Sequence, residues 1–377
     1  MARSTLLLIP LFIAAAISIL FLSHYFIYFS AVHFFALSGR RKLLLGIVLF
    51  LLPASFIGSS ILARQMDNPI GKALYFCSGL WLGVGLTLMM TFALAWIAWG
   101  IARIAALRPA PAALGAVAVA VAVLYSAYGV WNARHPRVHH VTVKIKNLPP
   151  AWQGKSVVQL SDVHLGHIWG AAFLEKLVKE ANAQKPAAVF ITGDLFDGAD
   201  GRLEGLVAPL DKLQAPQGVY FITGNHEIYL GVDRAFAALK KTKIRVLNDE
   251  MVTLDGLQII GVAYPRQGES KNLAEVVKGL GYDPKLPSVL LYHSPAQTER
   301  TRAAGINLQL AGHTHYGQIF PFQFVTWRVF GKYYRGLHVE SDYTLYTSSG
   351  AGTWGPAMRT GNRPEISVLH LQTASVE

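Results

Sequence analysis

Four long stretches of this sequence contain no Lys, Arg, Asp or Glu, and they constrain the fold more than any other feature. A helix of about 20 apolar residues crosses the hydrocarbon of a bilayer, so each stretch is long enough to span a membrane. The first is also far longer than the apolar core of a signal peptide, which has about 7–15 residues. The uncharged stretches are residues 4–39, 43–63, 73–102 and 109–133.

We therefore predict a transmembrane anchor over residues 1–133, since basic residues flank the stretches as they flank membrane helices. An alternative is three spans and a re-entrant segment. We expect His24 and His33 at the interface, and no buried acid suggests a transport site. The four helices are expected at about 5–36, 43–63, 73–102 and 111–132.

The net charge of +12 is concentrated beside these stretches. Residues 1–140 hold ten Lys or Arg and one acid, Asp67, a net charge of +9, and residues 141–377 carry the remaining +3. The charged half therefore has no basic surface for nucleic acid. With 52% hydrophobic residues the chain is not disordered. The single cysteine, Cys77, excludes an intramolecular disulfide and a CxxC site.

The basic residues also predict an orientation. With both ends of the four-helix anchor on one side, that side carries seven Lys or Arg and the other side five. Basic residues favour the cytoplasmic side, so we expect a cytoplasmic soluble half and a chain in the inner or plasma membrane. The seven are Arg3, Arg64, Lys72, Arg134, Arg137, Lys144 and Lys146, and the five are Arg40, Arg41, Lys42, Arg103 and Arg108.

The second half has the pattern of an α/β domain. Residues 134–150 form a linker and a first strand at 141–146, and a domain over residues 151–377 follows. Amphipathic stretches at 174–181 and 203–213 predict helices between short apolar runs. The strand-like runs are 156–160, 187–192, 218–223, 257–262, 288–292, 307–311, 343–347 and 365–371.

Five of these runs end in Asp, Asn or His. Because ligands of open α/β folds collect at the carboxyl ends of strands, we expect the five ends to meet at one rim. Taken singly, such a residue is more often a cap or a turn, but five in order indicate a site. The glycines before them, Gly193, Gly224 and Gly312, would let the chain turn sharply. The candidate ligands are Asp162, His164, Asp194, Asn225, His293, His313 and His315.

These residues suit a pair of divalent metal ions. Asp162 and His164 are two positions apart, so on extended backbone both point the same way. His313 and His315 share this spacing, which suits one histidine on each of two metals about 3.5–4 Å apart. Asp194 could bridge the two ions. A set of nitrogen and oxygen ligands without sulfur suits Mn, Fe or Zn.

In order and spacing, these motifs resemble the calcineurin-like metallophosphoesterases. The resemblance covers roughly 150–371, and the run 348–352 followed by 363–366 resembles a membrane-linked branch. It implies a four-layer sandwich of two mixed β-sheets flanked by helices. It also implies two metals, with Mn the expected metal in vitro: Asp162, His164 and His315 on one, Asn225, His293 and His313 on the other, and Asp194 bridging.

The resemblance also implies roles for residues beside the ligands. His226 resembles the catalytic histidine, which contacts the phosphate and assists the leaving oxygen. Glu227 stands where many members have Asp and would orient His226. From its position alone, Asp197 is a candidate for supporting the ligands or for a turn. Tyr316 stands where this branch often has Gly, which affects the shape of the pocket.

Aromatic and basic residues alternate directly after the last ligands, over residues 320–335. This segment either packs as a core loop or dips into lipid and presents Arg328, Lys332 or Arg335 to an anionic head group. His167 and Trp169 either line the pocket or lie in an exposed loop. Arg359 and Arg363 are candidates for phosphate contacts or for salt bridges.

The sequence thus predicts a membrane-anchored, dinuclear-metal phosphoesterase that cleaves a phosphodiester or pyrophosphate bond. Because four spans bring little to an enzyme of soluble nucleotides, we expect an amphiphilic, lipid-linked substrate; similar enzymes include phosphodiesterases acting on UDP-2,3-diacylglucosamine. One alternative is a broad phosphodiesterase or nucleotidase that the anchor only localises. Another is a membrane scaffold without activity. The sequence leaves the oligomeric state open.

Overall fold

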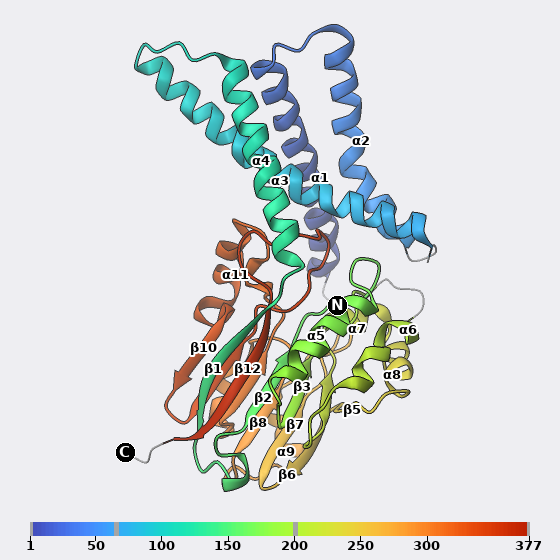
Figure 1. Ribbon diagram of the computed structural model, residues 1–377, viewed down its shortest axis with the longest axis vertical. Coiled ribbons are helices and arrows are strands. Elements are labelled where there is room, and N and C mark those ends of the chain that lie inside the picture. The colour runs from blue at the N-terminus through green and yellow to red at the C-terminus, as the bar shows by residue number, and fades with distance from the viewer. Residues whose placement is uncertain (1–2, 64–67, 199–202, 375–377) are drawn as a thin grey trace. The chain divides into compact units, whose positions relative to one another are not determined.

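The computed structural model describes residues 3–63, 68–198 and 203–374. It divides into two compact units, which are described separately (Figure 1). The first unit is Met1–Val130 with Gly355–Met358, and the second is Trp131–Trp354 with Arg359–Glu377. Arg64 and Asp67, which entered the charge pattern, lie outside the described residues.

The first unit consists of long apolar helices. In the part of the chain that the structure describes, four helices are long and apolar enough to cross a membrane, which confirms the four N-terminal apolar helices. α3 starts earlier than predicted because the Asn68 side chain accepts a hydrogen bond from Gly71 N at 2.9 Å, with Pro69 in the first turn. The helices are α1 (Arg3–Phe34), α2 (Gly39–Ala63), α3 (Pro69–Ile104) and α4 (Pro111–Ala133).

Polar side chains inside this unit pair with each other between helices. His24 is buried, and its Nε2 accepts a hydrogen bond from the indole of Trp81 at 2.9 Å. The Trp96 indole donates to Ser30 Oγ at 2.9 Å in the same way. Such interhelical hydrogen bonds hold apolar helices together in lipid. His24 therefore packs between α1 and α3, and its position at the membrane interface stays a prediction.

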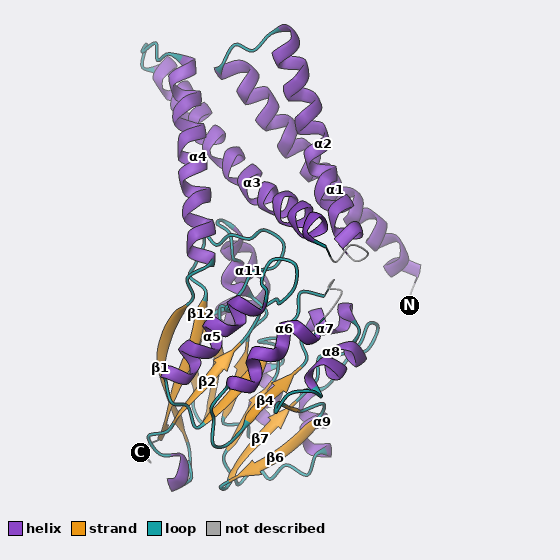
Figure 2. Cartoon of the chain, turned by 45° about the vertical axis from the view of Figure 1, so that its right-hand side comes forward, coloured by secondary structure: helices purple, strands orange, loops and turns teal. Residues whose placement is uncertain are grey.

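Among the described residues of the second unit, the strands form two six-stranded mixed sheets. The first has the order β1-β12-β2-β3-β4-β5 and the second β10-β11-β9-β8-β7-β6 (Figures 1 and 2). The first sheet contains β1 (Arg137–Ile145), β12 (Glu365–Thr373), β2 (Ser156–Leu160), β3 (Ala188–Thr192), β4 (Val219–Ile222) and β5 (Arg245–Val246). The second contains β10 (Gly336–Glu340), β11 (Tyr343–Thr347), β9 (Leu308–Ala311), β8 (Ser288–Leu291), β7 (Leu257–Gly261) and β6 (Glu250–Leu254).

Three buried clusters show how the layers stack. Side chains alternate along each strand, so Val158 of β2 packs outward with α5 (Ala171–Ala183) and α8 (Val232–Leu239). Its neighbour Val157 packs inward against the second sheet. The outer face of the second sheet is covered by α9 (Leu273–Gly279). The result is the predicted four-layer sandwich of two mixed sheets between helices.

Several elements differ from the sequence expectation. The helix predicted over 203–213 is a short α6 (Glu204–Val207) followed by a 3-10 helix η2 (Ala208–Lys212), because Pro209 has no N–H for a continuous helix. β5, β6 and β10 were not predicted. The first strand starts at Arg137 instead of residue 141, because Arg137 pairs with Glu365 in a parallel ladder with β12.

Strand direction decides where the polar loops lie. β2, β3 and β4 run parallel in the first sheet, and β7, β8 and β9 run parallel in the second. The carboxyl ends of each set of parallel strands therefore reach a common edge of their sheet. The predicted ligands follow these ends.

Candidate metal centre

Each predicted ligand lies just beyond a strand of one of the two parallel sets. Asp162 and His164 follow β2, and Asp194 follows β3. Asn225 is the first residue of α7 (Asn225–Leu230), directly after β4, while His293 follows β8. His313 and His315 follow β9, and His315 opens the 3-10 helix η3 (His315–Gly317).

The structure brings six of these seven residues together in groups that could hold a metal ion. Within the described chain there are three such groups, each with ligand atoms within 4.8 Å of one another. They overlap, because His164 and Asp194 each belong to two groups. The groups are Asp162, His164 and His315; His164, Asp194 and His226; and Asp194, His293 and His313.

Asp194 connects the two ends of this cluster. Its Oδ2 lies 3.1 Å from His293 Nε2 and 3.9 Å from His164 Nε2. On the far side, His315 Nε2 lies 3.0 Å from His164 Nε2 and 3.3 Å from Asp162 Oδ1. The two sheets thus contribute jointly to one continuous cluster of carboxylates and imidazoles.

From the two-residue spacing we had expected extended backbone in these loops. The structure shows instead that the backbone is not extended there. Asp162 and His164 both have φ of 53°, Asp194 has 50°, and His313 and His315 have 72° and 46°. Outside Gly this left-handed region is uncommon, and Asn, Asp and His are the residues that adopt it most often. Several such residues in one cluster are typical of functional sites, where surrounding contacts hold the backbone in place.

Glycines give these loops the space that they need. Gly193 has φ of 88°, so it turns the chain as predicted. Gly224 and Gly312 do not have positive φ, and their role is close approach. A Cβ on Gly224 would lie 2.2 Å from Asp194 Oδ1, and one on Gly312 would lie 2.2 Å from Asp162 Oδ2.

Three buried polar atoms of the cluster make no hydrogen bond of normal geometry within the described chain, although carboxylate oxygens lie 3.1 Å from the first and 3.3 Å from the last: His293 Nε2, Asn225 Oδ1 and His164 Nδ1. Buried polar atoms are normally paired, so unpaired ones at a cluster of this composition fit a missing cation. His293 is already oriented for this role, because its Nδ1 donates to the carbonyl of Thr192 at 2.8 Å and directs Nε2 to the cluster.

The ionisation states are those that a metal site requires. Although burial opposes charge, His315 holds the pKa of Asp162 below its usual value, and His293 does the same for Asp194. Burial lowers the pKa of His164 to about 3, and that of His313 and His315 to about 4. Ionised carboxylates and neutral imidazoles are the forms that bind metals.

His293 differs, because Asp194 outweighs the effect of burial and raises its pKa to about 10. A metal bound at this nitrogen would release the proton.

His226 faces the cluster from α7. Its ring lies edge-on to that of His164 with centroids 4.5 Å apart, and its Nδ1 donates to the carbonyl of Asp197 at 2.7 Å. Burial opposes protonation, but Asp194 and then Asp197 raise the pKa of His226. Asp197 also lies close to His164, with Oδ1 3.3 Å from Nδ1.

Glu227 is fully buried and supports the loops instead of contacting the His226 ring. Its carboxylate accepts hydrogen bonds from the backbone N–H groups of Asp194 at 2.9 Å, Phe196 at 3.1 Å and Gly224 at 2.7 Å. Burial and the nearby Asp194 raise the pKa of Glu227 to about 7. It therefore ties the β3 and β4 loops to each other.

Arg359 was considered as a phosphate contact, but the structure buries it completely behind His315. Its guanidinium donates to the carbonyls of Gly352 and Ser349 and reaches His315 Nδ1 at 3.2 Å. Asn362 donates to the carbonyl of His315. No periodic pattern marks residues 355–363, so the burial of Arg359 could not be predicted from the sequence.

Tyr264 is a second neighbour of the cluster that the sequence did not single out. Its ring centroid lies 5.8 Å from that of His293 and 6.1 Å from that of His313. It follows β7, which is parallel to β8, so the strand-end rule that found the ligands could have found it. Its position suits contact with a bound substrate.

The remaining candidates lie in varied surroundings. His167 and Trp169 are both buried, so the exposed-loop alternative is wrong; the Trp169 indole donates to Thr353 at 2.9 Å. Lys332 pairs with Glu340 at 2.5 Å, and Arg335 stacks over the Tyr316 ring at 4.2 Å. Arg328 is exposed on α11 (Phe322–Phe330).

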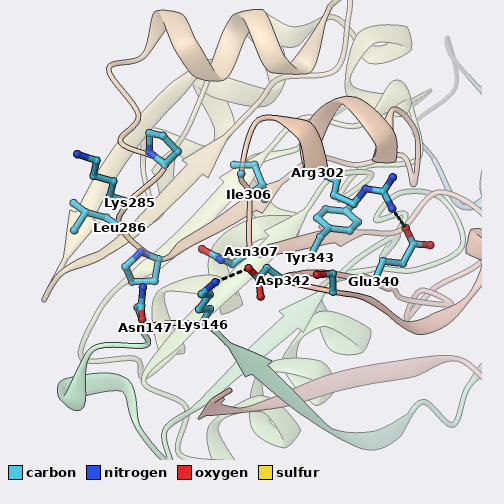
Figure 3. A pocket seen from close by; sticks show the side chains of 14 residues that line it. Lys146, Asn147, Lys285, Leu286, Arg302, Ile306, Asn307, Glu340, Asp342 and Tyr343 are labelled. Carbon is cyan, nitrogen blue, oxygen red and sulfur yellow. Dashed lines mark hydrogen bonds and ion pairs between the residues drawn. The ribbon is translucent and has the colours of Figure 1, made fainter. Parts of the chain in front are cut away.

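A cavity of about 650 Å³ lies at the opposite end of the strands of the second sheet from the cluster (Figure 3). It is lined by residues before β8 and β9, such as Pro287 and Asn307, and hence lies at the amino ends of the strands that carry the cluster. Figure 3 shows two ion pairs in it, Lys146 with Asp342 at 2.7 Å and Arg302 with Glu340 at 3.0 Å. It has no relation to the cluster of histidines.

A two-sheet sandwich with carboxylates and histidines at its strand ends is the architecture of a metallophosphoesterase. A family model described as "Calcineurin-like phosphoesterase" matches residues 155–317. The chain therefore carries a calcineurin-like metallophosphoesterase domain, preceded by four long apolar helices. Members of this family use two divalent metal ions, and the His/Asp groups described above fit them.

Three relatives extend the comparison. A Bos taurus protein named "Transmembrane protein with metallophosphoesterase domain" is 35% identical over 290 residues, which are 71% of this chain and 63% of that protein. An "Uncharacterized metallophosphoesterase" of Campylobacter jejuni is 34% identical over 63% of each chain. Another, of Aquifex aeolicus, is 29% identical over 67% of this chain and 98% of its own length.

The match thus spans less than two thirds of the first two relatives. With its apolar helices and these relatives, this chain is a membrane protein.

Proposed function

We propose that this chain is a membrane-anchored, dinuclear-metal phosphoesterase that hydrolyses a phosphodiester or pyrophosphate bond. The observation that carries the proposal is the position of Asp194 between two groups of ligands, with Asp162, His164 and His315 on one side and His293 and His313 on the other. Two divalent ions would need an anionic group between them, and Asp194 is that group.

In this proposal Asp162, His164 and His315 hold one metal. Asn225, His293 and His313 hold the other, with Asp194 shared by both. Bound there, two divalent ions polarise a phosphoryl oxygen and supply a hydroxide at neutral pH. Mn, Fe and Zn all suit this set of ligands.

His226 is the proposed proton donor to the leaving oxygen. Because its Nδ1 donates to the Asp197 carbonyl, Nε2 is the nitrogen free to face a substrate. Asp194 and Asp197 raise its pKa against the effect of burial. The ring of His226 therefore keeps its proton to a higher pH than an ordinary histidine does. Such a group typically contributes about 10²–10⁴-fold to the rate.

The membrane anchor supports a lipid-linked substrate, because such a substrate stays in the bilayer to which the domain is attached. The distribution of basic residues supports a cytoplasmic active site. An enzyme of free nucleotides that is merely localised is the alternative within the same chemistry.

The test uses the full-length protein in lipid nanodiscs, stripped of metal and reloaded with Mn. We expect metal-dependent cleavage of bis(p-nitrophenyl) phosphate by the native chain and none by Asp194→Asn. Asp283→Asn, a change on the surface away from the cluster, serves as the matched control and keeps full activity.

Activity retained in Asp194→Asn would contradict the two-metal site. A folded, metal-loaded protein without any hydrolysis would favour the non-catalytic scaffold. Comparison of CDP-diacylglycerol, a lipid-linked pyrophosphate, with a free nucleotide sugar separates the lipid enzyme from the general phosphodiesterase.

A further inference from the structure

The exposed apolar side chains of the second unit gather in one segment. Among the described residues after 133, eleven large hydrophobic side chains are exposed, and eight of them lie between residues 320 and 339. Monomeric soluble proteins rarely expose large contiguous apolar patches to water, so exposed apolar side chains gathered in one segment point to an interaction site. The eight, which we call the apolar segment, are Phe320, Phe322, Phe324, Val325, Trp327, Val329, Leu337 and Val339.

Helix α11, at the centre of this segment, turns its apolar side chains outward and its partly polar side inward. An ordinary surface helix turns its apolar stripe to the core. In α11 the half-buried stripe is Gln323, Thr326 and Phe330, at spacings of three and four. Arg328 is exposed, and the other exposed side chains of the helix are all apolar and 49–68% exposed: Phe322, Phe324, Val325, Trp327 and Val329.

The charged residues of the stretch 320–339 are all basic. They are Arg328, Lys332 and Arg335, of which Lys332 pairs with Glu340, the residue directly after the stretch. Arg328 lies on the exposed face of α11 and has no ion pair within the described chain. Aromatic and aliphatic side chains on one face, with basic residues among them, are typical of helices that lie in the interface of an anionic membrane.

The segment is fixed to the loop of the last two candidate ligands. The Phe330 ring lies edge-on to that of His313 at 5.7 Å, and Thr314 Oγ1 donates to the carbonyl of Tyr334 at 2.7 Å. A Cβ on Gly317 would lie 2.2 Å from Gln323 N, so the start of α11 presses on the turn after His315. One helix, about 10 Å across, separates the exposed face from the cluster.

The covalent chain keeps lipid within reach. α4 ends at Ala133 and β1 begins at Arg137, and the residues between them span at most about 14 Å when extended. A domain on so short a tether stays at the surface of the membrane that its helices cross.

We propose that the apolar segment inserts into the lipid headgroup region and holds the metal centre against the bilayer, so that the phosphoester is taken from a lipid in place. The bound partner is therefore an anionic lipid surface. The substrate class, a phosphoester at the headgroup of a membrane lipid, rests on the function proposed above, whereas the insertion does not.

The first experiment measures insertion without activity. In a Cys77→Ser background, Phe324→Cys is labelled with an environment-sensitive fluorophore in the full-length protein, reconstituted with phosphatidylglycerol and nitroxide-labelled lipid. We expect the nitroxide lipid to quench this label by about two-fold or more. Leu286→Cys is the control and stays unquenched. Leu286 is exposed and lies just before β8, at the end of the strand away from the cluster. Equal signals at both positions would overturn the proposal and favour a protein partner on this surface.

The second experiment separates the surface from the chemistry. Phe324→Ser with Trp327→Ser should lower the turnover of CDP-diacylglycerol in vesicles by about ten-fold, because apolar area leaves the interface, while bis(p-nitrophenyl) phosphate turnover is unchanged. Equal loss for both substrates would contradict a role in lipid access. A quenched label in a chain that cleaves neither substrate would refute the proposed function and leave the insertion standing.

Discussion

The guanidinium of Arg359 lies 3.2 Å from Nδ1 of His315, within a fully buried network. A guanidinium can only donate hydrogen bonds, so the imidazole nitrogen accepts. Burial, together with the charge of Arg359, opposes protonation of His315, whose pKa falls to about 4. Arg359 thus positions one candidate ligand from behind without reaching substrate.

Arg359→Met should therefore destabilise the second unit and lower metal occupancy. It leaves the carbonyls of Gly352 and Ser349 without their donor, at a cost of about 1–3 kcal/mol for each buried group. Thermal unfolding and metal content of the purified protein measure both effects. Arg363→Met, an exposed neighbour, should change neither, and a native-like Arg359→Met protein would contradict the role of this network.

His226→Gln should reduce kcat by about 10²–10⁴-fold, the contribution of a positioned proton donor. Metal content should remain that of the native protein, because the proposed ligands are intact. His140→Gln, which changes an exposed histidine of β1, is the matched control. If His226→Gln instead loses metal, His226 is a ligand, as its place in the middle group of the cluster would allow.

Gly312→Ala should abolish metal binding, because its Cβ would lie 1.9 Å from Ser161 Oγ and 2.2 Å from Asp162 Oδ2. Neither neighbour is free to move, since both are buried. Gly205→Ala in α6, where a Cβ meets nothing within 4 Å, should raise stability by up to about 1 kcal/mol. Titration of Mn into the metal-free variants checks the contrast; equal affinities would be incompatible with the packing described.

Removal of metal should lower the thermal stability of the second unit. A ligand present at a thousand times its dissociation constant stabilises the folded state by about 4 kcal/mol. Unfolding followed with and without chelator should show this shift in the native chain and a much smaller one in Asp194→Asn. A shift of the same size in both would mean that the metal acts elsewhere.

The cluster of candidate ligands could be predicted because it depends on strand order and on residue type. Asp194 and His293 each follow a continuous apolar run, and parallel strands bring such ends together. The conformation of the loops could not be predicted in this way. Asp162 and His164 look like the end of an extended strand, yet both have positive φ, which contacts from distant residues such as Gly352 impose.

The fold was predicted where local pattern and burial agree. β5 has two residues and β10 alternates between half-buried and exposed positions, so neither gives a strong apolar signal. The stretch 203–213 does form helical turns, but Pro209 prevents one continuous α-helix. The burial of Arg359 depends on carbonyls from a loop that has no periodicity.

The place of β12 has a consequence for biosynthesis. β12 lies between β1 and β2, so the first sheet stays open until residues 365–373 have left the ribosome. By then the apolar helices, made much earlier, have long been available for insertion. In the meantime the edge of β2 has no neighbour on that side, and an unpaired edge is a site of aggregation. The sheet can therefore close only once nearly the whole domain has been made.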